Sequence, residues 1–140
     1  HGVAVNILTK GGRRSERDFD LLKNDPLSKY GATLTFCKEK DSLEWEPGAT
    51  LPAERLDALK KAHDLGIGTW ASLEPVIDPE QSLDLIRRTA DYVDEYKIGK
   101  WNHDARAKLI DWKDFAEKAM DLCRSYGKTF ILKKDLAAYL

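Results

Sequence analysis

Short apolar runs alternate with longer amphipathic stretches along the whole sequence, and no other feature limits the possible folds as strongly. One strand and one helix together occupy roughly 30 residues, a repeat that is typical of parallel βαβ units with right-handed crossovers. The predicted fold class is therefore α/β, with one compact or half-closed sheet of about five strands. Strands are expected at residues 3–9, 32–37, 68–76, 96–100 and 129–132, and helices at 15–23, 52–65, 78–93, 111–126 and from 135 onward.

Local signals indicate where two of these helices begin and where one ends. Asp78 is followed by Pro79 and Gln81, which places an N-cap acid, a proline at the first helical position and a glutamine at the third. Asp111 can cap the next helix in the same way, and Gly127 supplies its stop. The helices therefore start on the side of the sheet where the preceding strands end.

Charge and hydropathy disfavour two kinds of partner. The sequence has 23 lysines and arginines against 24 aspartates and glutamates, a net charge of −1. Because the two signs are mixed along the chain, no global field attracts a polyanion, so nucleic acid is only weakly supported as a partner. The apolar runs are far shorter than the roughly 20 residues that span a bilayer, and no signal segment opens the chain. These features predict a cytoplasmic protein without membrane contact.

The carboxyl ends of the predicted strands carry the candidate functional residues, because parallel α/β folds place their sites at that edge. Lys10 and Arg13 flank two glycines after the first strand and could hold an anion, although a solvated turn explains them equally well. Glu74 ends an otherwise apolar strand and would need a donor such as Lys10 or Lys100. A structural ion pair would give the same sequence.

A second group of candidates follows the fourth strand. Trp101, Asn102 and His103 offer the stacking and hydrogen-bonding groups that recognise a base or an adenine ring. A single histidine is weak evidence for a site, and His63, near a helix end, is more consistent with a structural role.

Several segments in order resemble the radical-SAM proteins related to spore photoproduct lyase, often called DNA repair photolyase-like. Residues 7–10 resemble that family's strand ending in Thr-Lys, and residues 17–22 are similar to its Arg-Asp-x-Asp-x-Leu helix. Residues 33–35 stand where the family has a strand with a central Ser or Thr. Residues 45–49 and Arg55 match its Glu-Pro-x-Ala and downstream arginine. The similarity extends over about the first 80 residues.

The resemblance implies that residues 1–140 form the C-terminal half of a partial TIM-like (β/α) barrel. Its parent would be a lyase-like enzyme that uses S-adenosylmethionine and a 4Fe-4S cluster. Lys10 and Thr35 would contact the amino-acid end of S-adenosylmethionine. The backbone around residues 71–74 and 98–100, including Glu74 and Lys100, would lie along its adenosine. The substrate contacts would be Arg13, Trp101, Asn102 and His103.

One motif of the family is missing from these 140 residues. Its Cys-x-x-x-Cys-x-x-Cys loop has no counterpart, and the two cysteines, Cys37 and Cys123, are far apart and more consistent with structural thiols. Three thiolates are needed to leave one iron open for the cofactor. We therefore expect the chain to be inactive alone and to retain neither cofactor. Because His1 and Gly2 resemble a helix end, we also expect an upstream half-barrel in the parent protein.

Two further expectations follow from the same residues. The strand at 3–9 would be a sheet edge with unpaired backbone groups, which predicts a homodimer formed through that edge. The alternative function is a self-contained anion- or nucleotide-binding α/β module that uses the same strand-end lysines without redox chemistry. A DNA-binding domain is a third reading, and the neutral charge argues against it.

Overall fold

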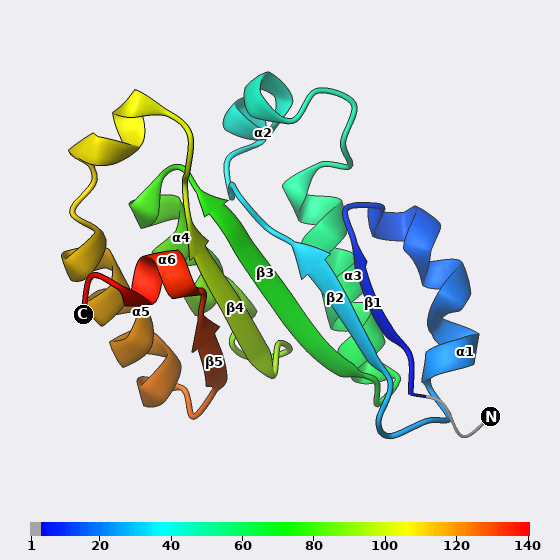
Figure 1. Cartoon of the computed structure of the whole chain (residues 1–140). Coiled ribbons are helices and arrows are strands. Elements are labelled where there is room, and N and C mark those ends of the chain that lie inside the picture. The colour runs from blue at the N-terminus through cyan, green and yellow to red at the C-terminus, as the bar shows by residue number, and fades with distance from the viewer. Residues whose placement is uncertain (1–3) are drawn as a thin grey trace.

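The structure, a computed structural model, describes residues 4–140 and contains one sheet of five parallel strands. Their order in the sheet is β1-β2-β3-β4-β5, so neighbours along the chain are also neighbours in space (Figure 1). This sequential order confirms the α/β class and the partial TIM-like barrel, because doubly wound sheets reverse their strand order. The strands are β1 (Asn6–Thr9), β2 (Lys29–Thr33), β3 (Gly68–Val76), β4 (Glu95–Lys100) and β5 (Thr129–Leu132).

The longer helices pack against one face of the sheet and leave the other face open (Figure 1). Shorter helices follow the carboxyl ends of β1, β2, β4 and β5. Among residues 4–140, no helix is both long enough and apolar enough to cross a bilayer. The long helices are α3 (Pro52–Asp64), α4 (Pro79–Thr89) and α5 (Trp112–Ser125), and the short ones are η1 (Gly12–Asp18), α1 (Phe19–Leu22), α2 (Glu39–Trp45), η2 (Ala105–Leu109) and α6 (Lys134–Ala137).

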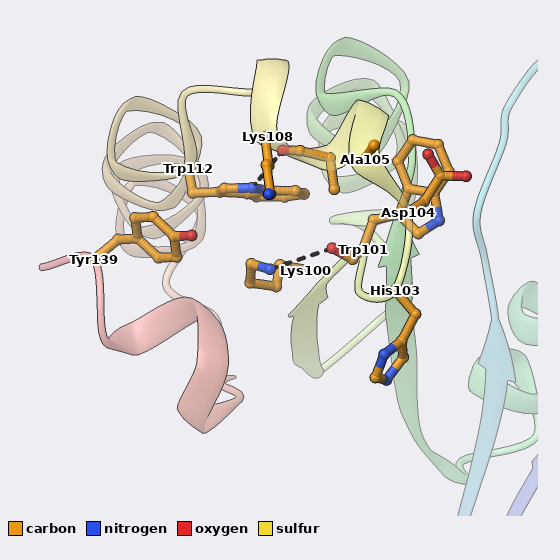
Figure 2. A pocket seen from close by; sticks show the side chains of 9 residues that line it. Lys100, Trp101, His103, Asp104, Ala105, Lys108, Trp112 and Tyr139 are labelled. Atoms are coloured by element: carbon orange, nitrogen blue, oxygen red, sulfur yellow. Dashed lines mark hydrogen bonds between the residues drawn. The ribbon is translucent and has the colours of Figure 1, made fainter.

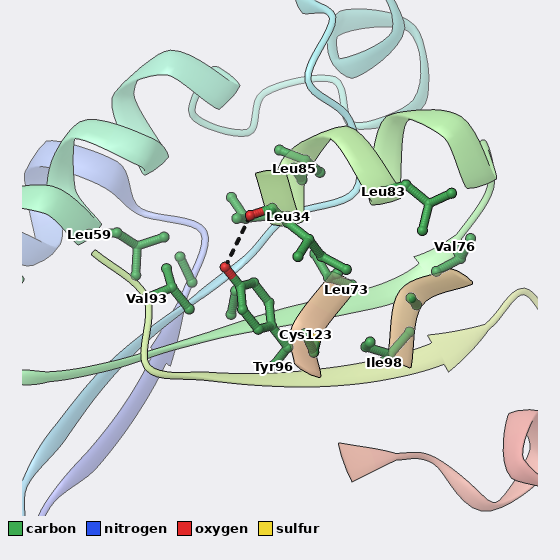
Figure 3. Close-up of a cluster of buried hydrophobic side chains, with 14 of the residues drawn as sticks. Leu34, Leu59, Leu73, Val76, Leu83, Leu85, Val93, Tyr96, Ile98 and Cys123 are labelled. Carbon is green, nitrogen blue, oxygen red and sulfur yellow. Dashed lines mark hydrogen bonds between the residues drawn. The ribbon is translucent and has the colours of Figure 1, made fainter. Parts of the chain in front are cut away.

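The core lies between the sheet and these helices, because alternate strand residues point to the helical side. Leu73, Tyr96 and Ile98 are completely buried there (Figure 3). The Tyr96 hydroxyl forms a 2.6 Å hydrogen bond with the hydroxyl of Thr89 on α4, which satisfies the one polar group of that side chain. The main hydrophobic core therefore lies on the helical side of the sheet.

The open face is the concave side of the partial barrel, and two glycines allow large side chains to lie flat on it. A Cβ on Gly31 would stand 2.3 Å from the Trp70 ring, and one on Gly99 would stand 2.0 Å from a Glu74 carboxylate oxygen. Trp70 also donates from its ring nitrogen to Asn6 Oδ1 at 2.6 Å. Side chains of β3 thus cover both neighbouring strands on this face.

Some predicted boundaries agree with the structure, whereas the strand expected at 3–9 begins at Asn6 and the helix expected at 78–93 ends at Thr89. The strands at 68–76 and 129–132 and the caps at Asp78 and Asp111 are confirmed, since both carboxylates accept backbone N–H groups of the first helical turn. The strand expected at 32–37 is displaced toward the N-terminus. Only Leu34 extends the pairing beyond Thr33, by donating its N–H to the Ser72 carbonyl.

The end of that apolar run, which does not pair in the sheet, is buried in another way. Phe36 packs near Trp45 of α2, with ring centroids 6.3 Å apart, so residues after 34 are covered by this unpredicted helix instead of pairing in the sheet. The segment 15–23 is helical, but residues 15–18 belong to the 3-10 helix η1 and residues 19–22 form the short α-helix α1. The described residues exclude His1, Gly2 and Val3, so the predictions that concern these three stay predictions.

Candidate functional site

The carboxyl ends of all five strands lie at one edge of the sheet, as the parallel order requires (Figure 1). The segments that follow them carry nearly all of the predicted site residues. The structure divides these residues among several places, namely a charge cluster with Lys10, the concave face with Glu74, the cavity beside Lys100 and a hollow beside Arg13.

Lys10 belongs to a charge cluster that includes a fully buried arginine. Its ammonium lies 3.0 Å from Glu46 Oε1, and the same carboxylate accepts from Arg55 Nη2 at 3.0 Å. Arg55 also donates to the carbonyls of Thr33 and Thr50, both at 2.8 Å. Burial disfavours the charged carboxylate, but the hydrogen bonds from Lys10 and Arg55 outweigh it and lower the pKa of Glu46. The cluster ties the end of β2 to α2 and α3.

Thr35 carries a buried hydroxyl with no protein partner. The residue is 2% exposed, and among the described residues its Oγ1 makes no hydrogen bond. Buried hydroxyls are nearly always hydrogen-bonded, because leaving one unpaired costs on the order of 1–3 kcal/mol. A bound polar ligand could supply the missing partner, so this atom fits the predicted contact to a cofactor.

Glu74 has a different partner from the two that the sequence suggested. Both of its carboxylate oxygens lie 3.2 Å from the ammonium of Lys133, at the end of β5. The carboxylate rests above Gly99 on the concave face. Lys100 is the next residue of β4, so its side chain leaves from the opposite face of the sheet. The expected pairing with Lys10 or Lys100 is therefore wrong.

Lys100 points toward α5 and α6, where it lies beside two aromatic rings (Figure 2). Its ammonium is 5.5 Å from the centre of the Trp112 ring and 6.0 Å from that of Tyr139. It donates to Asn102 Oδ1 at 3.0 Å and to the Trp101 carbonyl at 3.3 Å. These groups border a cavity of about 420 Å³.

Trp101 takes part in an aromatic cluster, in which its ring meets that of Trp45 edge-on with 5.5 Å between the ring centres. The Arg106 guanidinium lies 5.0 Å from the ring centres of both Trp101 and Trp45, so it joins η2 to α2. Asp104 holds this guanidinium by two hydrogen bonds, of 2.8 and 3.0 Å. The Arg106 side chain and backbone N–H lower the pKa of Asp104 to about 2. Sequence reasoning missed Arg106, because its partner Trp45 is 61 residues earlier in the chain.

The remaining predicted residues are more exposed. His103 has a left-handed backbone, with φ of 63°, and lies at the rim of the cavity beside Lys100. Arg13 lines a separate hollow of about 300 Å³ between η1 and the loop at residues 48–51. His63 is exposed on α3. The structure thus brings Lys100 and residues 101–103 together, and it keeps Arg13 apart from them.

The two cysteines cannot hold an iron–sulfur cluster in the three-thiolate manner. Burial raises the pKa of Cys123 to about 11 and also raises that of Cys37, so both stay protonated at neutral pH. Within residues 4–140, no group of three or more His, Cys, Asp or Glu side chains is arranged to bind a metal ion. The cluster therefore does not fit the residues of this chain.

No family model matches this sequence, and no curated protein matches it. The fold is shared with three crystal structures of SuiB from Streptococcus suis, each at 13% identity and with TM-scores of 0.75, 0.76 and 0.74. One of these is bound to S-adenosylmethionine and another to the precursor peptide SuiA. Each alignment covers 98% of this chain and 34–35% of SuiB.

A more distant likeness exists to orotidine 5′-monophosphate decarboxylase from Methanocaldococcus jannaschii, complexed with the inhibitor BMP. Its TM-score is 0.56 at 10% identity, and the alignment covers 100% of this chain and 58% of the decarboxylase. At these identities the comparisons establish the fold alone, a partial (β/α) barrel. The chain spans about a third of the length of SuiB.

Proposed function

We propose that this chain is the C-terminal part of a radical SAM enzyme and supplies walls for S-adenosylmethionine together with contacts to the substrate. The observation that carries the proposal is the likeness, over 98% of the chain, to a protein solved with S-adenosylmethionine bound. The segments that resemble motifs of the DNA repair photolyase-like group favour a lyase-like parent of that kind.

Two residues near the carboxyl ends of β1 and β2 suit the amino-acid end of this cofactor. S-adenosylmethionine carries an amine and a carboxylate at that end, and the buried Thr35 hydroxyl can bond to either group. Lys10, with half of its side chain exposed, can turn from Glu46 toward a carboxylate. The adenosine would lie along the backbone of residues 71–74 and 98–100, with Glu74 and Gly99 beneath it.

The proposed substrate contacts are Arg13, Trp101, Asn102 and His103. The cluster that radical SAM chemistry requires would be held by an upstream half-barrel, because this chain cannot bind it. We therefore propose that the isolated chain is inactive. No step of the reaction is assigned to its residues beyond binding and orientation.

Titration with S-adenosylmethionine, followed by amide chemical shifts, tests the proposal. We expect weak, saturable binding that shifts the signals of Lys10, Thr35 and residues 98–100. Thr35→Val should abolish these shifts, whereas Thr129→Val, an exposed threonine at the opposite end of β5, should leave them unchanged. Absence of any shift at millimolar cofactor, or equal binding by Thr35→Val, would contradict the proposal.

The partners of the chain are part of the same proposal. β1 and β5 are the edges of the sheet in the described residues, and both expose unpaired backbone groups. We expect the upstream half-barrel to pair with β1, and a homodimer to form through that edge in its absence. Light scattering at high protein concentration measures this, and a monodisperse monomer would contradict the dimer.

A further inference from the structure

We infer that the cavity beside Lys100 binds a phosphate monoester attached to a planar ring, of the nucleoside monophosphate class. The cavity lies on the helix-covered side of β4, between η2, the start of α5 and the end of α6 (Figure 2). It is distinct from the segment that carries Thr35 and from the concave face where Glu74 lies. All of its lining residues fall within residues 100–139.

The charge of the cavity is the first argument. Lys100 and Lys108 both line it, and in the part of the chain that the structure describes neither has a carboxylate within 4.0 Å. The one carboxylate in the lining, Asp104, is already occupied by Arg106 through two hydrogen bonds. Two ammonium groups without counter-charges create a local positive potential, which favours an anion carrying two charges.

The position of Lys100 is fixed before any ligand binds. Its ammonium donates to two neutral oxygens, at Trp101 and Asn102, and Asn102 is itself held by a 3.3 Å hydrogen bond to Asp135. One of the three N–H donors of the ammonium remains for a ligand. A side chain that is already ordered loses little conformational entropy on binding.

The side chains that line the cavity determine which chemical group can be attached to the bound anion. Trp112 is 3% exposed and rigid, because its ring nitrogen donates to the Ala107 carbonyl at 2.9 Å and its ring packs edge-on against Phe115. Tyr139 is 46% exposed on the other side and can close over a ligand. The exposed ring of Tyr139 beside a cationic group suits a planar ring that bears a phosphate, and the Trp112 side chain forms the rigid base of the cavity. The volume of about 420 Å³ is within the range of small-molecule sites.

Isothermal titration of the purified chain with adenosine 5′-monophosphate, adenosine and inorganic phosphate tests this inference. We expect the monophosphate to bind most tightly, because it alone uses both the lysines and the rings. Its affinity should fall as ionic strength rises, since the lysines are near the surface. Binding of inorganic phosphate as tight as that of the monophosphate would overturn the assignment of a ring to this site. Absence of binding at millimolar monophosphate, in ~10-fold excess over the protein, would overturn the site itself.

Matched variants localise the binding. Lys100→Met and Lys108→Met should each weaken the monophosphate by about tenfold, the effect of removing a charge-assisted hydrogen bond. Lys113→Met, an exposed lysine in the first turn of α5 that does not line the cavity, is the control and should bind normally. Equal affinity of all three variants for the monophosphate would show that it binds outside this cavity. Circular dichroism verifies that each variant is folded.

The two proposed sites can be tested independently of each other. Thr35→Val should impair S-adenosylmethionine without affecting the monophosphate, and Lys108→Met should do the reverse. If the monophosphate instead displaces S-adenosylmethionine competitively, the two ligands share one site and this inference is wrong, while the proposed function stands.

Discussion

Near the carboxyl ends of β1, β2 and β3, the carboxylates of Glu46 and Glu74 have basic partners. Beside the end of β4, two lysines line a cavity and have no carboxylate partner among the described residues. Glu46 is held by Lys10 and Arg55, and Glu74 by Lys133. Lys100 has only neutral acceptors and aromatic rings around it. Paired charges fasten loops to the sheet, while unpaired ones remain available to a ligand. The two regions should therefore respond in opposite ways to the loss of a charge.

The largest effect is expected for Arg55→Met. The substitution leaves Glu46 largely buried without its guanidinium partner and removes the donors to the Thr33 and Thr50 carbonyls. Breaking a buried ion pair on one side costs about 3–5 kcal/mol, which urea denaturation would measure. Arg124→Met removes an exposed arginine paired with Asp121 and should change stability by less than about 0.5 kcal/mol. Similar losses in both variants would show that Arg55 does not fasten these loops.

A smaller effect is expected for Gly31→Ala on the concave face. The new methyl group would meet the rigid Trp70 ring, and we expect a loss of about 1–3 kcal/mol with a change in tryptophan fluorescence. Gly99→Ala should cost less, because the group that it meets is the flexible end of Glu74. Gly68→Ala, whose nearest neighbour is at 3.5 Å, is the control. If the control destabilises as much as Gly31→Ala, strand propensity and not the ring is the cause.

The pH dependence of stability provides a third test. The pKa of Glu46 is lower in the folded chain than its usual value of 4.5. As the pH falls, the unfolded chain therefore binds a proton at Glu46 before the folded chain does. The contribution of the ionised Glu46 to the free energy of unfolding is complete above pH 4.5 and is lost progressively below it. Glu46→Gln should flatten the stability profile between pH 5 and 3, measured by denaturant titration. A profile as steep as that of the parent chain would contradict this.

The smallest effect on stability is expected beside the cavity that Lys100 lines. Lys100→Met removes an ammonium without a carboxylate partner and places an apolar side chain against Trp112 and Tyr139. We expect the free energy of unfolding to change by less than about 0.5 kcal/mol, or to rise. A loss comparable to that of Arg55→Met would show that the two regions do not differ in the way we describe.

Much of the fold could be predicted because its signals are local. Apolar runs bounded by glycine or charged residues placed β3 and β5 correctly, and capping depends on a few adjacent residues such as Asp78 and Asp111. The segment that became α2 has only two large apolar side chains, Leu43 and Trp45, and both are partly exposed. It therefore carries too weak a periodicity to indicate a helix.

The sequence by itself determined the parallel α/β arrangement and the edge of the sheet that carries the polar residues. The tertiary structure alone decided which of those residues meet. Glu74 and Lys100 belong to adjacent strands, yet the register places Glu74 above Gly99 and so sends Lys100 to the other face. Register and long-range contacts, such as Trp45 with Arg106, depend on packing energies summed over the whole core, and no local stretch of sequence contains that sum.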